Sequence, residues 1–469
     1  MKNFLISWRN LWRNKRRTLI TIASVFFAVF FALVMRSLQL GTYNHMYRNV
    51  IESYTGYLQV QHQDFWDTKT IDNVFPPDSE LERTILSDPN AVMTVPRLES
   101  FALVSSGALT KGVMVMGIDP DNENRLSDVR SRLVRYRITQ QNLDELKKRL
   151  PDRYSSRIDL LSGKSYSNSS SVLLDLSVAK EDTSVVMDIF RKYASFSNGY
   201  ISKNEPGALI GDKLSAFLDA SVGDTVVLIG QGYQGATAAG KYPIRGIIKV
   251  PAPDLDSRIV YLPVNTAQEL YNAPGMVTSL VIIVKDKSDR SINRMISSLG
   301  QKIKPPLRII GWREMNELMI NQMDADSKSG MIMVAILYLV IAFGIFGTVL
   351  MMTAERRREF GVLVAIGMQK TRLSAIVAIE MLYIGIMGVL SGALAALPVI
   401  YYGHYNPIRF SGEMGRMYEN YGMEPVMPMM LPDWYFLWQS VVIGIIVLIA
   451  IAYPVRKIMK MKVVKSLKA

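Results

Sequence analysis

Few residues in this sequence could carry out chemistry, and those few are widely separated. The histidines, His45, His62 and His404, have no second ligand at metal-binding spacing, and the chain contains no cysteine. Serines are plentiful, but the pattern contains no pairing of a serine with a histidine that would mark a nucleophile and its base. We therefore expect neither a catalytic residue nor a metal site in this chain.

Two further features have a chemical interpretation and a structural one. Residues 413–430 are rich in methionine, a soft ligand for copper, but no cysteine or nearby histidine pair strengthens such a site. Methionine is also a pliable apolar filler, so a short external loop within residues 403–433 is favoured.

Glu380 is the second of these features, because it lies inside an apolar stretch. An intramembrane carboxylate is by default a functional hypothesis. No apolar stretch offers it a second ionisable partner for a proton relay, so a buried polar contact between helices is favoured.

Four apolar stretches determine the class of protein. Each approaches or exceeds the roughly 20 residues that a helix needs to cross about 30 Å of hydrocarbon. They are residues 18–40, 330–353, 373–402 and 434–454. We therefore predict a membrane protein with four transmembrane α-helices.

The positive charge of the chain, +13 overall, lies beside these stretches. Residues 1–17, 354–372 and 455–469 carry +6, +3 and +6. Short basic flanks stay in the cytoplasm, which predicts that both termini and the 354–372 segment are cytoplasmic and that residues 41–329 lie outside. Nucleic-acid binding would need a basic patch on a folded domain, so we expect no nucleic-acid partner.

The first 17 residues are predicted to form an interfacial helix in contact with membrane lipid. The apolar residues Phe4, Leu5, Trp8, Leu11 and Trp12 recur there at helical spacing, as in helices that lie in the membrane surface. The apolar stretch that follows is long and ends without a small-x-small cleavage pattern. We therefore expect it to stay in the protein as an anchor.

Residues 41–329 alternate strand-like and helical segments, which predicts a large α+β domain inserted between the first and second spans. Strand-like segments include "AVMTVPRLESFALVSS" and "KGVMVMGI", and helical ones include "QQNLDELKKRL" and "RSINRMISSLGQKI". Amphipathic helices after the first span and over 312–329 are predicted to form stalks. The serine-rich residues 162–171 are interpreted as a loop or flexible tip, inside an insertion or subdomain over 121–198.

A resemblance to a known family rests on several segments in order. The segment "ERRREFGVLVAIGMQKTRL" at 355–373 resembles the signature of the FtsX-like, or MacB-type, permeases of ABC transporters. The segments "SWRNLWRNKRRTLIT", "GALIGDKLSAFLDASVGDTVVLI" and "AIAYPVRKIMKMKVVKSLKA" resemble the entry motif, the periplasmic core and the last-span exit of that family. The lipoprotein-releasing branch is resembled by "DLDSRIVYLPVNTAQELY" and "GWREMNELM", while the region near 121–198 looks longer than in that branch.

This resemblance implies the partners and the location of the protein. Such permeases lie in the bacterial inner membrane, with the large domain in the periplasm, and work with a second permease copy or a paralogue. A cytoplasmic ABC ATPase dimer drives them. Because this chain has no GxxxxGK[ST] phosphate loop, ATP and magnesium are expected in that partner, and no cofactor in this chain.

The segment between the second and third spans is the predicted contact with the ATPase. Phe360, Leu363, Val364 and Gly367 fall on one helical face, and Gly367 is predicted to end the helix. A basic loop that only fixes topology is the alternative; the resemblance favours a coupling helix seated in an ATPase groove. The predicted coupling residues are Glu355, Arg356, Arg357, Arg358, Glu359, Phe360, Gly361, Leu363, Ala365, Ile366 and Gly367.

The resemblance favours lipoproteins as cargo, extracted from the inner membrane and passed to a periplasmic carrier. A mechanotransmitting regulator of a periplasmic cell-wall hydrolase and a MacB-like exporter of peptides or drugs are the alternatives. An apolar cavity for acyl chains could be lined by aromatic and methionine side chains of the first two spans, although lipid-facing or interhelical packing is favoured. These residues are Phe27, Phe31, Met35, Phe343 and Phe346.

Overall fold

The computed structural model describes residues 2–13, 15–410, 412–420 and 423–461. The chain divides into two compact units. The helical unit comprises Met1–His45, Asn321–Ile408 and Met427–Ala469, and the α+β unit comprises Met46–Ile320 and Arg409–Val426. The predicted fold class is confirmed: a large α+β domain is inserted between the first and second of the apolar helices.

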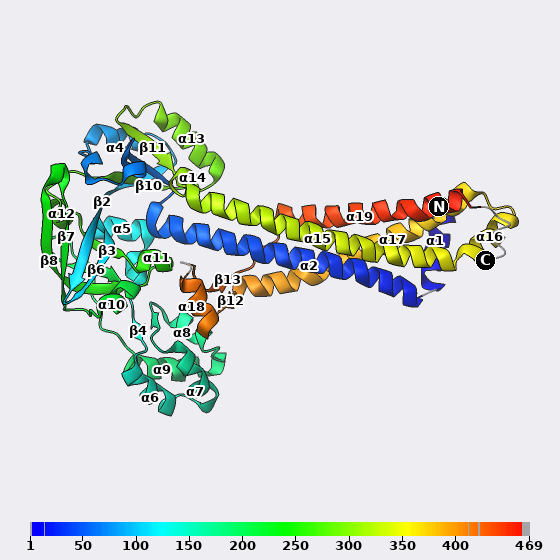
Figure 1. The fold of residues 1–469 in the computed structure, drawn as a ribbon, viewed down its shortest axis with the longest axis horizontal. Coiled ribbons are helices and arrows are strands. Elements are labelled where there is room, and N and C mark those ends of the chain that lie inside the picture. Colours follow the sequence, from blue (N-terminus) through cyan, green and yellow to red (C-terminus); the bar gives the residue numbers. More distant parts are fainter. Residues whose placement is uncertain (1, 14, 411, 421–422, 462–469) are drawn as a thin grey trace. The chain divides into compact units, whose positions relative to one another are not determined.

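Within the described residues, four helices are long and apolar enough to cross a membrane. They are α2 (Lys15–Val50), α15 (Glu317–Glu355), α17 (Lys370–Tyr405) and α19 (Trp434–Met459), and they run alongside one another in Figure 1. Each contains one of the four predicted apolar stretches. Both α2 and α15 extend beyond those stretches without a break, as the stalk prediction requires, although the second stalk helix begins at Glu317 rather than at Trp312.

Glycines of α17 allow the long helices to approach closely. A Cβ atom added at Gly388 would lie 2.5 Å from the Cβ of Val25 on α2. A Cβ atom at Gly385 would lie 2.6 Å from a methyl carbon of Val447 on α19. Small residues at such positions let helix backbones come together, which compensates for the weak hydrophobic drive between helices in lipid.

Helix α1 (Lys2–Arg13) is confirmed as a helix and packs on α17. The hydroxyl of Ser7 donates to the carbonyl oxygen of Ile376 at 2.9 Å, and Leu11 is buried. Leu11, predicted among the lipid-facing residues, thus belongs to the bundle. Exposed apolar side chains remain on the other faces of α1, at Phe4, Leu5, Ile6, Trp8 and Trp12, and their contact with lipid stays a prediction.

The α+β unit is built on one nine-stranded sheet with the order β11-β1-β10-β2-β3-β9-β6-β8-β7. All strands of the sheet pair antiparallel except β3 with β9 and β6 with β8. The strands are β1 (Leu58–His62), β2 (Ala91–Ser106), β3 (Leu109–Ile118), β6 (Ala208–Gly211), β7 (Thr225–Gln231), β8 (Thr237–Ile248), β9 (Ile259–Pro263), β10 (Ser279–Val284) and β11 (Leu307–Gly311).

The long strand β2 divides this sheet into two parts. Its first half pairs with β10, and its second half pairs with β7 through registers such as Leu103 with Ile229. Because β7 is also the last strand of the sheet order, this second pairing curls the strands from β2 to β7 into a closed barrel. Buried residues of the barrel strands, such as Val104, Val115 and Leu228, form its core.

Short helices cover the sheet. Helix α13 uses Ile292, Met295 and Leu299, at i, i+3 and i+7, to pack in a cluster with β1, β10 and β11. The α-helices of this part, α13 included, are α3 (Phe65–Thr68), α4 (Ser79–Leu86), α5 (Pro120–Ser127), α10 (Asp212–Leu218), α11 (Pro253–Asp256), α12 (Val264–Leu270), α13 (Asp289–Gly300) and α14 (Trp312–Met315).

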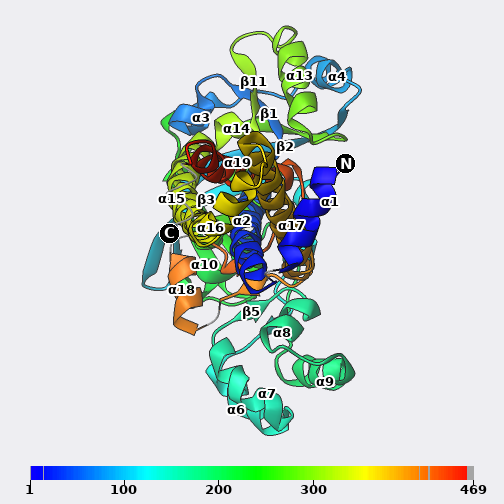
Figure 2. The same ribbon diagram turned by 90° about the vertical axis from the view of Figure 1, so that its right-hand side faces the viewer.

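Residues 136–194 form a group with a hydrophobic cluster of their own, and Figures 1 and 2 show its helices together. The elements are β4 (Tyr136–Arg137), α6 (Gln140–Arg149), α7 (Asp152–Ile158), β5 (Ser165–Tyr166), α8 (Ser169–Asp175) and α9 (Thr183–Tyr193). We call this group the insertion subdomain. It starts later than the predicted range 121–198, because α5 packs with the sheet through a buried ion pair between Glu123 and Arg97.

The interpretation of residues 162–171 as a loop or flexible tip is wrong. Ser165 and Tyr166 are buried in β5, which pairs with β4. The side chain of Asn168 caps α8 by accepting from the backbone N–H of Ser171 at 2.8 Å. Serine and asparagine are favoured at helix N-termini as well as in loops, so composition alone could not separate the two.

The segment 403–433, predicted as a short external loop, is folded. It contains β12 (Ile408–Arg409), α18 (Gly412–Asn420) and β13 (Val426–Met427), and β12 pairs with β13. Residues Arg409–Val426 belong to the α+β unit. Ion pairs of Arg409 with Asp175 at 3.5 Å and of Glu419 with Lys213 at 2.8 Å hold them there.

Candidate functional site: the helix between the second and third spans

Helix α16 (Arg357–Ala365) stands between α15 and α17 and ends as the sequence predicts. Gly367 has φ 104°, in the left-handed region. The backbone N–H of Met368 donates to the carbonyl oxygen of Leu363 at 3.0 Å, and that of Gly367 donates to Val364 at 3.1 Å. This is the Schellman arrangement, and the predicted cap at Gly367 is confirmed.

The apolar face of α16 packs against the helical unit of its own chain. Phe360 is only 2% exposed, Gly361 is buried, and Leu363 and Val364 are half-buried in the cluster that contains Leu373. The face that the sequence predicts as apolar therefore anchors the helix. A partner that binds α16 must use another face.

The outward face of α16 combines exposed charge with exposed apolar side chains. Ile366 is 75% exposed and Val362 is 44% exposed. The predicted coupling residues that are exposed are Glu355, Arg357, Arg358, Glu359, Ala365, Ile366 and Gly367. Val362 was missed by sequence reasoning, because it lies off the apolar stripe; an apolar residue among charges on the opposite face was the available signal.

Ion pairs connect α16 to two other helices. The Arg356 guanidinium, where α15 ends, lies 2.5 Å from a carboxylate oxygen of Glu380 on α17 and 3.4 Å from Glu359. Glu359 also pairs with Arg13 of α1 at 2.7 Å. Glu380 thus makes a buried polar contact, as favoured from the sequence, but its partner comes from the segment between the spans. No spacing in the sequence indicates these partners.

Two hollows flank α16. One, of about 530 Å³, lies toward α1 and α17 and is lined by Ile6, Asn10, Arg13, Arg356, Arg358, Glu359, Val362, Leu363, Met368, Leu373, Ile376 and Val377. The other, of about 610 Å³, lies toward the end of α19 and is lined by Leu350, Thr353, Ala354, Arg357, Phe360, Tyr453, Arg456, Lys457, Ile458, Lys460 and Met461. Helix α16 is therefore a ridge between two recesses, a shape that a groove on another protein can receive.

The residues considered for an apolar cargo cavity are not enclosed in this chain. Phe27, Phe31, Met35 and Phe343 are each at least half exposed. Phe346 is half-buried, with its ring 5.1 Å from that of Tyr453. The residues of α15 that pack into the bundle are Ile345 and Val349 instead. Lipid-facing or interhelical packing, the interpretation favoured from the sequence, stays a prediction.

Comparison with known proteins bears on the same part of the chain. Residues 331–463, which contain α16 and three of the four long apolar helices in whole or part, match the family model of the FtsX-like permease C-terminal domain.

Two relatives resemble part of the chain. An uncharacterized ABC transporter permease of Methanocaldococcus jannaschii is 26% identical over 166 residues, which cover 34% of this chain and 40% of the relative. The lipoprotein-releasing system transmembrane protein LolC of Xylella fastidiosa is 23% identical over 211 residues, which cover 42% of this chain and 49% of the relative. The matches thus span less than half of each relative's length.

A solved structure resembles the chain more weakly. The periplasmic region of MacB from Actinobacillus actinomycetemcomitans matches 58% of this chain and 96% of its own length, with a TM-score of 0.30 and 11% sequence identity. A similarity of this size is too small to carry an argument about fold or function.

Proposed function

Because this chain belongs to the FtsX-like permeases of ABC transporters, we propose that it is the membrane subunit on which a separate ATPase acts. The ATPase binds ATP and magnesium in the cytoplasm and seats on α16. Two permease chains, alike or paralogous, work around an ATPase dimer. The permease itself contributes no catalytic group and changes the conformation of its outer domain.

The outward face of α16 is the observation that carries this proposal. The helix is anchored to its own bundle by Phe360, so it can pass on a displacement instead of yielding to it. It also presents exposed Val362 and Ile366 between charged residues. Exposed apolar side chains rimmed by charge are typical of protein contacts.

The long helices supply a route for the displacement. Helix α2 runs from the span into the α+β unit, where a π-helical turn (Ile51–Thr55) and β1 follow it. The Tyr54 hydroxyl in that turn donates to Glu99 of β2 at 2.6 Å. On the other side β11 leads through α14 into α15. Movement of either span is thus transmitted to the sheet through covalent continuity and buried contacts.

The orientation proposed from charge placement gives this route its direction. The termini and α16 lie in the cytoplasm of a bacterium, the four spans cross its inner membrane, and the α+β unit lies in the periplasm. The net charges of the segments that flank the spans support this orientation.

The cargo proposed is a lipoprotein, extracted from the inner membrane and passed to a periplasmic carrier. The similarity to the lipoprotein-releasing protein LolC and the motifs of the sequence support this choice. Exposed Phe27, Phe31 and Phe343 offer an apolar surface to acyl chains or to a second permease copy. Regulation of a cell-wall hydrolase and MacB-like export of peptides or drugs are the competing functions.

The coupling proposal is tested at the exposed positions of α16. Ala365→Glu and Ile366→Glu place a charge on the outward face without disturbing Phe360, whereas a substitution at buried Gly361 would also disturb packing. We expect both variants to lose co-purification with the ATPase and ATPase stimulation. Val185→Glu, at a 51% exposed position of the insertion subdomain, is the matched control. Normal ATPase binding by both α16 variants would refute the assignment.

The cargo is tested by purification of the complex in mild detergent and mass spectrometry of what accompanies it. Acylated lipoproteins are the expected finding. A bound cell-wall hydrolase would support the regulator instead, and a periplasmic adaptor without lipoprotein would support export.

A further inference from the structure

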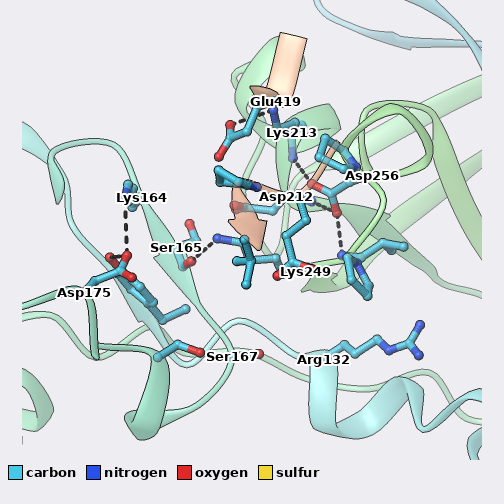
Figure 3. Close-up of a pocket in the computed structure, with 18 of the residues that line it drawn as sticks. Arg132, Lys164, Ser165, Ser167, Asp175, Asp212, Lys213, Lys249, Asp256 and Glu419 are labelled. Carbon is cyan, nitrogen blue, oxygen red and sulfur yellow. Dashed lines mark hydrogen bonds and ion pairs between the residues drawn. The ribbon is translucent and has the colours of Figure 1, made fainter. Parts of the chain in front are cut away.

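The α+β unit contains a polar cavity that neither the coupling helix nor the spans involve. Its volume is about 570 Å³, within the range of small-molecule sites. Three parts of the unit line it: the strands and turns near Lys249, the insertion subdomain around Ser167, and the segment from Arg409 to Val426. Figure 3 shows Lys249 between residues of the insertion subdomain and the Asp212–Asp256 region.

Every carboxylate in the wall of this cavity already has a donor from the protein. Asp175 pairs with Lys164 at 3.2 Å and with Arg409, and Glu419 pairs with Lys213. Asp212 pairs with Arg137 at 2.6 Å, and Glu424 accepts from Asn49 at 2.7 Å.

Asp256, the last of these carboxyl groups, is buried and satisfied by backbone donors. It accepts from the backbone N–H groups of Val250 at 2.8 Å, Lys213 at 2.9 Å and Asp212 at 3.3 Å. None of the acidic side chains in the wall therefore needs a cation from a ligand.

The basic side chains of the wall, unlike its carboxylates, are not all paired. Three of them have no carboxylate within 4.0 Å among the described residues. Lys249 donates only to the backbone carbonyl oxygen of Ser165, at 2.6 Å. Arg132 donates to the carbonyl oxygen of Glu52 at 3.4 Å, and Figure 3 shows its side chain pointing away from Lys249, so it is not counted among the cations available to a ligand. Arg135 makes no side-chain hydrogen bond in the described part of the chain.

Hydroxyl groups complete the set of unused donors. Ser167 and Ser171 line the cavity, and within the described residues their hydroxyls make no hydrogen bond. A wall with surplus positive charge and free hydroxyl donors is complementary to an anion with several oxygens. A carboxylate offers two oxygens and one negative charge to the two cations Lys249 and Arg135, whereas a phosphoryl group offers more acceptors and up to two negative charges.

We propose that this cavity binds a phosphate ester, with Lys249 and Arg135 as the cations that meet the phosphoryl group and Ser167 and Ser171 as further donors. The phosphoryl group could belong to a soluble metabolite or to a phospholipid headgroup. Such a ligand would bridge the insertion subdomain, the sheet and the segment between the third and fourth spans. It would therefore stabilise the α+β unit when bound.

Calorimetric titration of the purified full-length chain in an uncharged detergent tests this. The probes are glycerol phosphate and dihexanoyl phosphatidylglycerol below its micelle concentration. We expect saturable binding that weakens as salt is raised. Equal affinity for both probes identifies a soluble phosphate ester as sufficient, and binding of the lipid alone identifies a headgroup.

Arg135→Gln is the principal variant, because this exposed side chain holds no other residue in place. It and Lys249→Gln should each weaken binding about tenfold, the effect of losing one charge-assisted hydrogen bond. Lys241→Gln removes the same charge from an exposed position on β8, outside the cavity, and should leave affinity unchanged. Absence of saturable binding of both probes, or equal loss in Lys241→Gln and Arg135→Gln, would overturn the proposal. Neither readout involves the ATPase, so the proposed function is tested separately.

Discussion

Among the residues that the structure describes, two arginine–glutamate pairs are withdrawn from solvent, one in each unit, and they are satisfied to different degrees. In the α+β unit the side chains of Arg97 and Glu123 are 2% and 0% exposed. In the helical unit those of Arg356 and Glu380 are 13% and 3% exposed. Burial is thus similar, while the hydrogen bonding around the two pairs is not.

The pair in the α+β unit is complete. Arg97 donates from Nε to Glu123 at 2.9 Å and from Nη2 at 2.6 Å, and its Nη1 donates to the carbonyl oxygen of Tyr54. The Ser127 hydroxyl adds a bond of 2.6 Å to Glu123. A bidentate pair with further bonds fixes its geometry, so within the α+β unit this pair holds the π-helical turn at Ile51–Thr55 to β2.

The pair in the helical unit is incomplete. Arg356 makes a single contact with Glu380, and the other carboxylate oxygen of Glu380 is buried with no partner among the described residues. Arg356 also reaches Glu359, an exposed residue of α16. A guanidinium shared between two carboxylates can change partner when α16 moves. The contrast teaches that the ion pair at the sheet, Arg97–Glu123, is held in one geometry, whereas the ion pair beside α16, Arg356–Glu380, can exchange partners.

The largest effect is expected where the complete pair is broken. Glu123→Ala leaves the Arg97 charge buried without its partner, which should lower the free energy of unfolding of the α+β unit by about 3–5 kcal/mol. Thermal or denaturant unfolding of the full chain in detergent, followed by tryptophan fluorescence, measures this. Glu145→Ala removes an exposed glutamate that pairs on the surface with Arg149, and no resolvable change is expected. Equal stability of the two variants would contradict the role given to the buried pair.

The next largest effect on the free energy of unfolding is expected from Asp256, a buried carboxyl group that accepts hydrogen bonds from backbone N–H groups. Burial, and then repulsion by Asp212, raise the pKa of Asp256 to about 7. The folded state therefore holds this proton more tightly than the unfolded state, whose pKa is about 4. The stabilisation is complete below about pH 4 and is lost as pH rises through about 7, by roughly 2–4 kcal/mol. The test is to measure the free energy of unfolding of the wild type and of Asp256→Asn across this pH range. The variant should lack the fall in stability between about pH 4 and 7 that Asp256 contributes.

Breaking the incomplete pair, Arg356–Glu380, should lower the free energy of unfolding by a smaller amount. Arg356→Met leaves Glu380 without its cation, and we expect the free energy of unfolding to fall by about 1–3 kcal/mol. Neutralising both partners in Arg356→Met/Glu380→Gln should recover much of that loss, because no buried charge is left unpaired. Arg13→Gln, at the exposed end of the same network, should cost less than about 1 kcal/mol. A double variant as unstable as Arg356→Met would show that the pair contributes through packing only.

Much of the fold could be read from local pattern. The apolar stretches, the strand-like segments at β2 and β3 and the helical segments at α6 and α13 all lie within single elements, and the structure has each of them. Strands β6 and β11 were not predicted, because each has only three apolar residues and a glycine, too few to show a period of their own. The folded segment 409–426 was missed because the ion-pair partners of Arg409 and Glu419, Asp175 and Lys213, lie far away in the sequence.

The candidate site divides in the same way. The sequence by itself determined that α16 exists, that Gly367 ends it and that charge gathers at its front, because capping, helical period and net charge depend on neighbours in the chain. Only the tertiary structure decided that its apolar stripe faces inward, that Val362 and Ile366 face outward, and that Arg356 is shared by Glu359 and Glu380. It also brought Arg135 and Lys249 to one cavity. Direction and pairing depend on residues that are distant in the sequence, and packing alone brings those together.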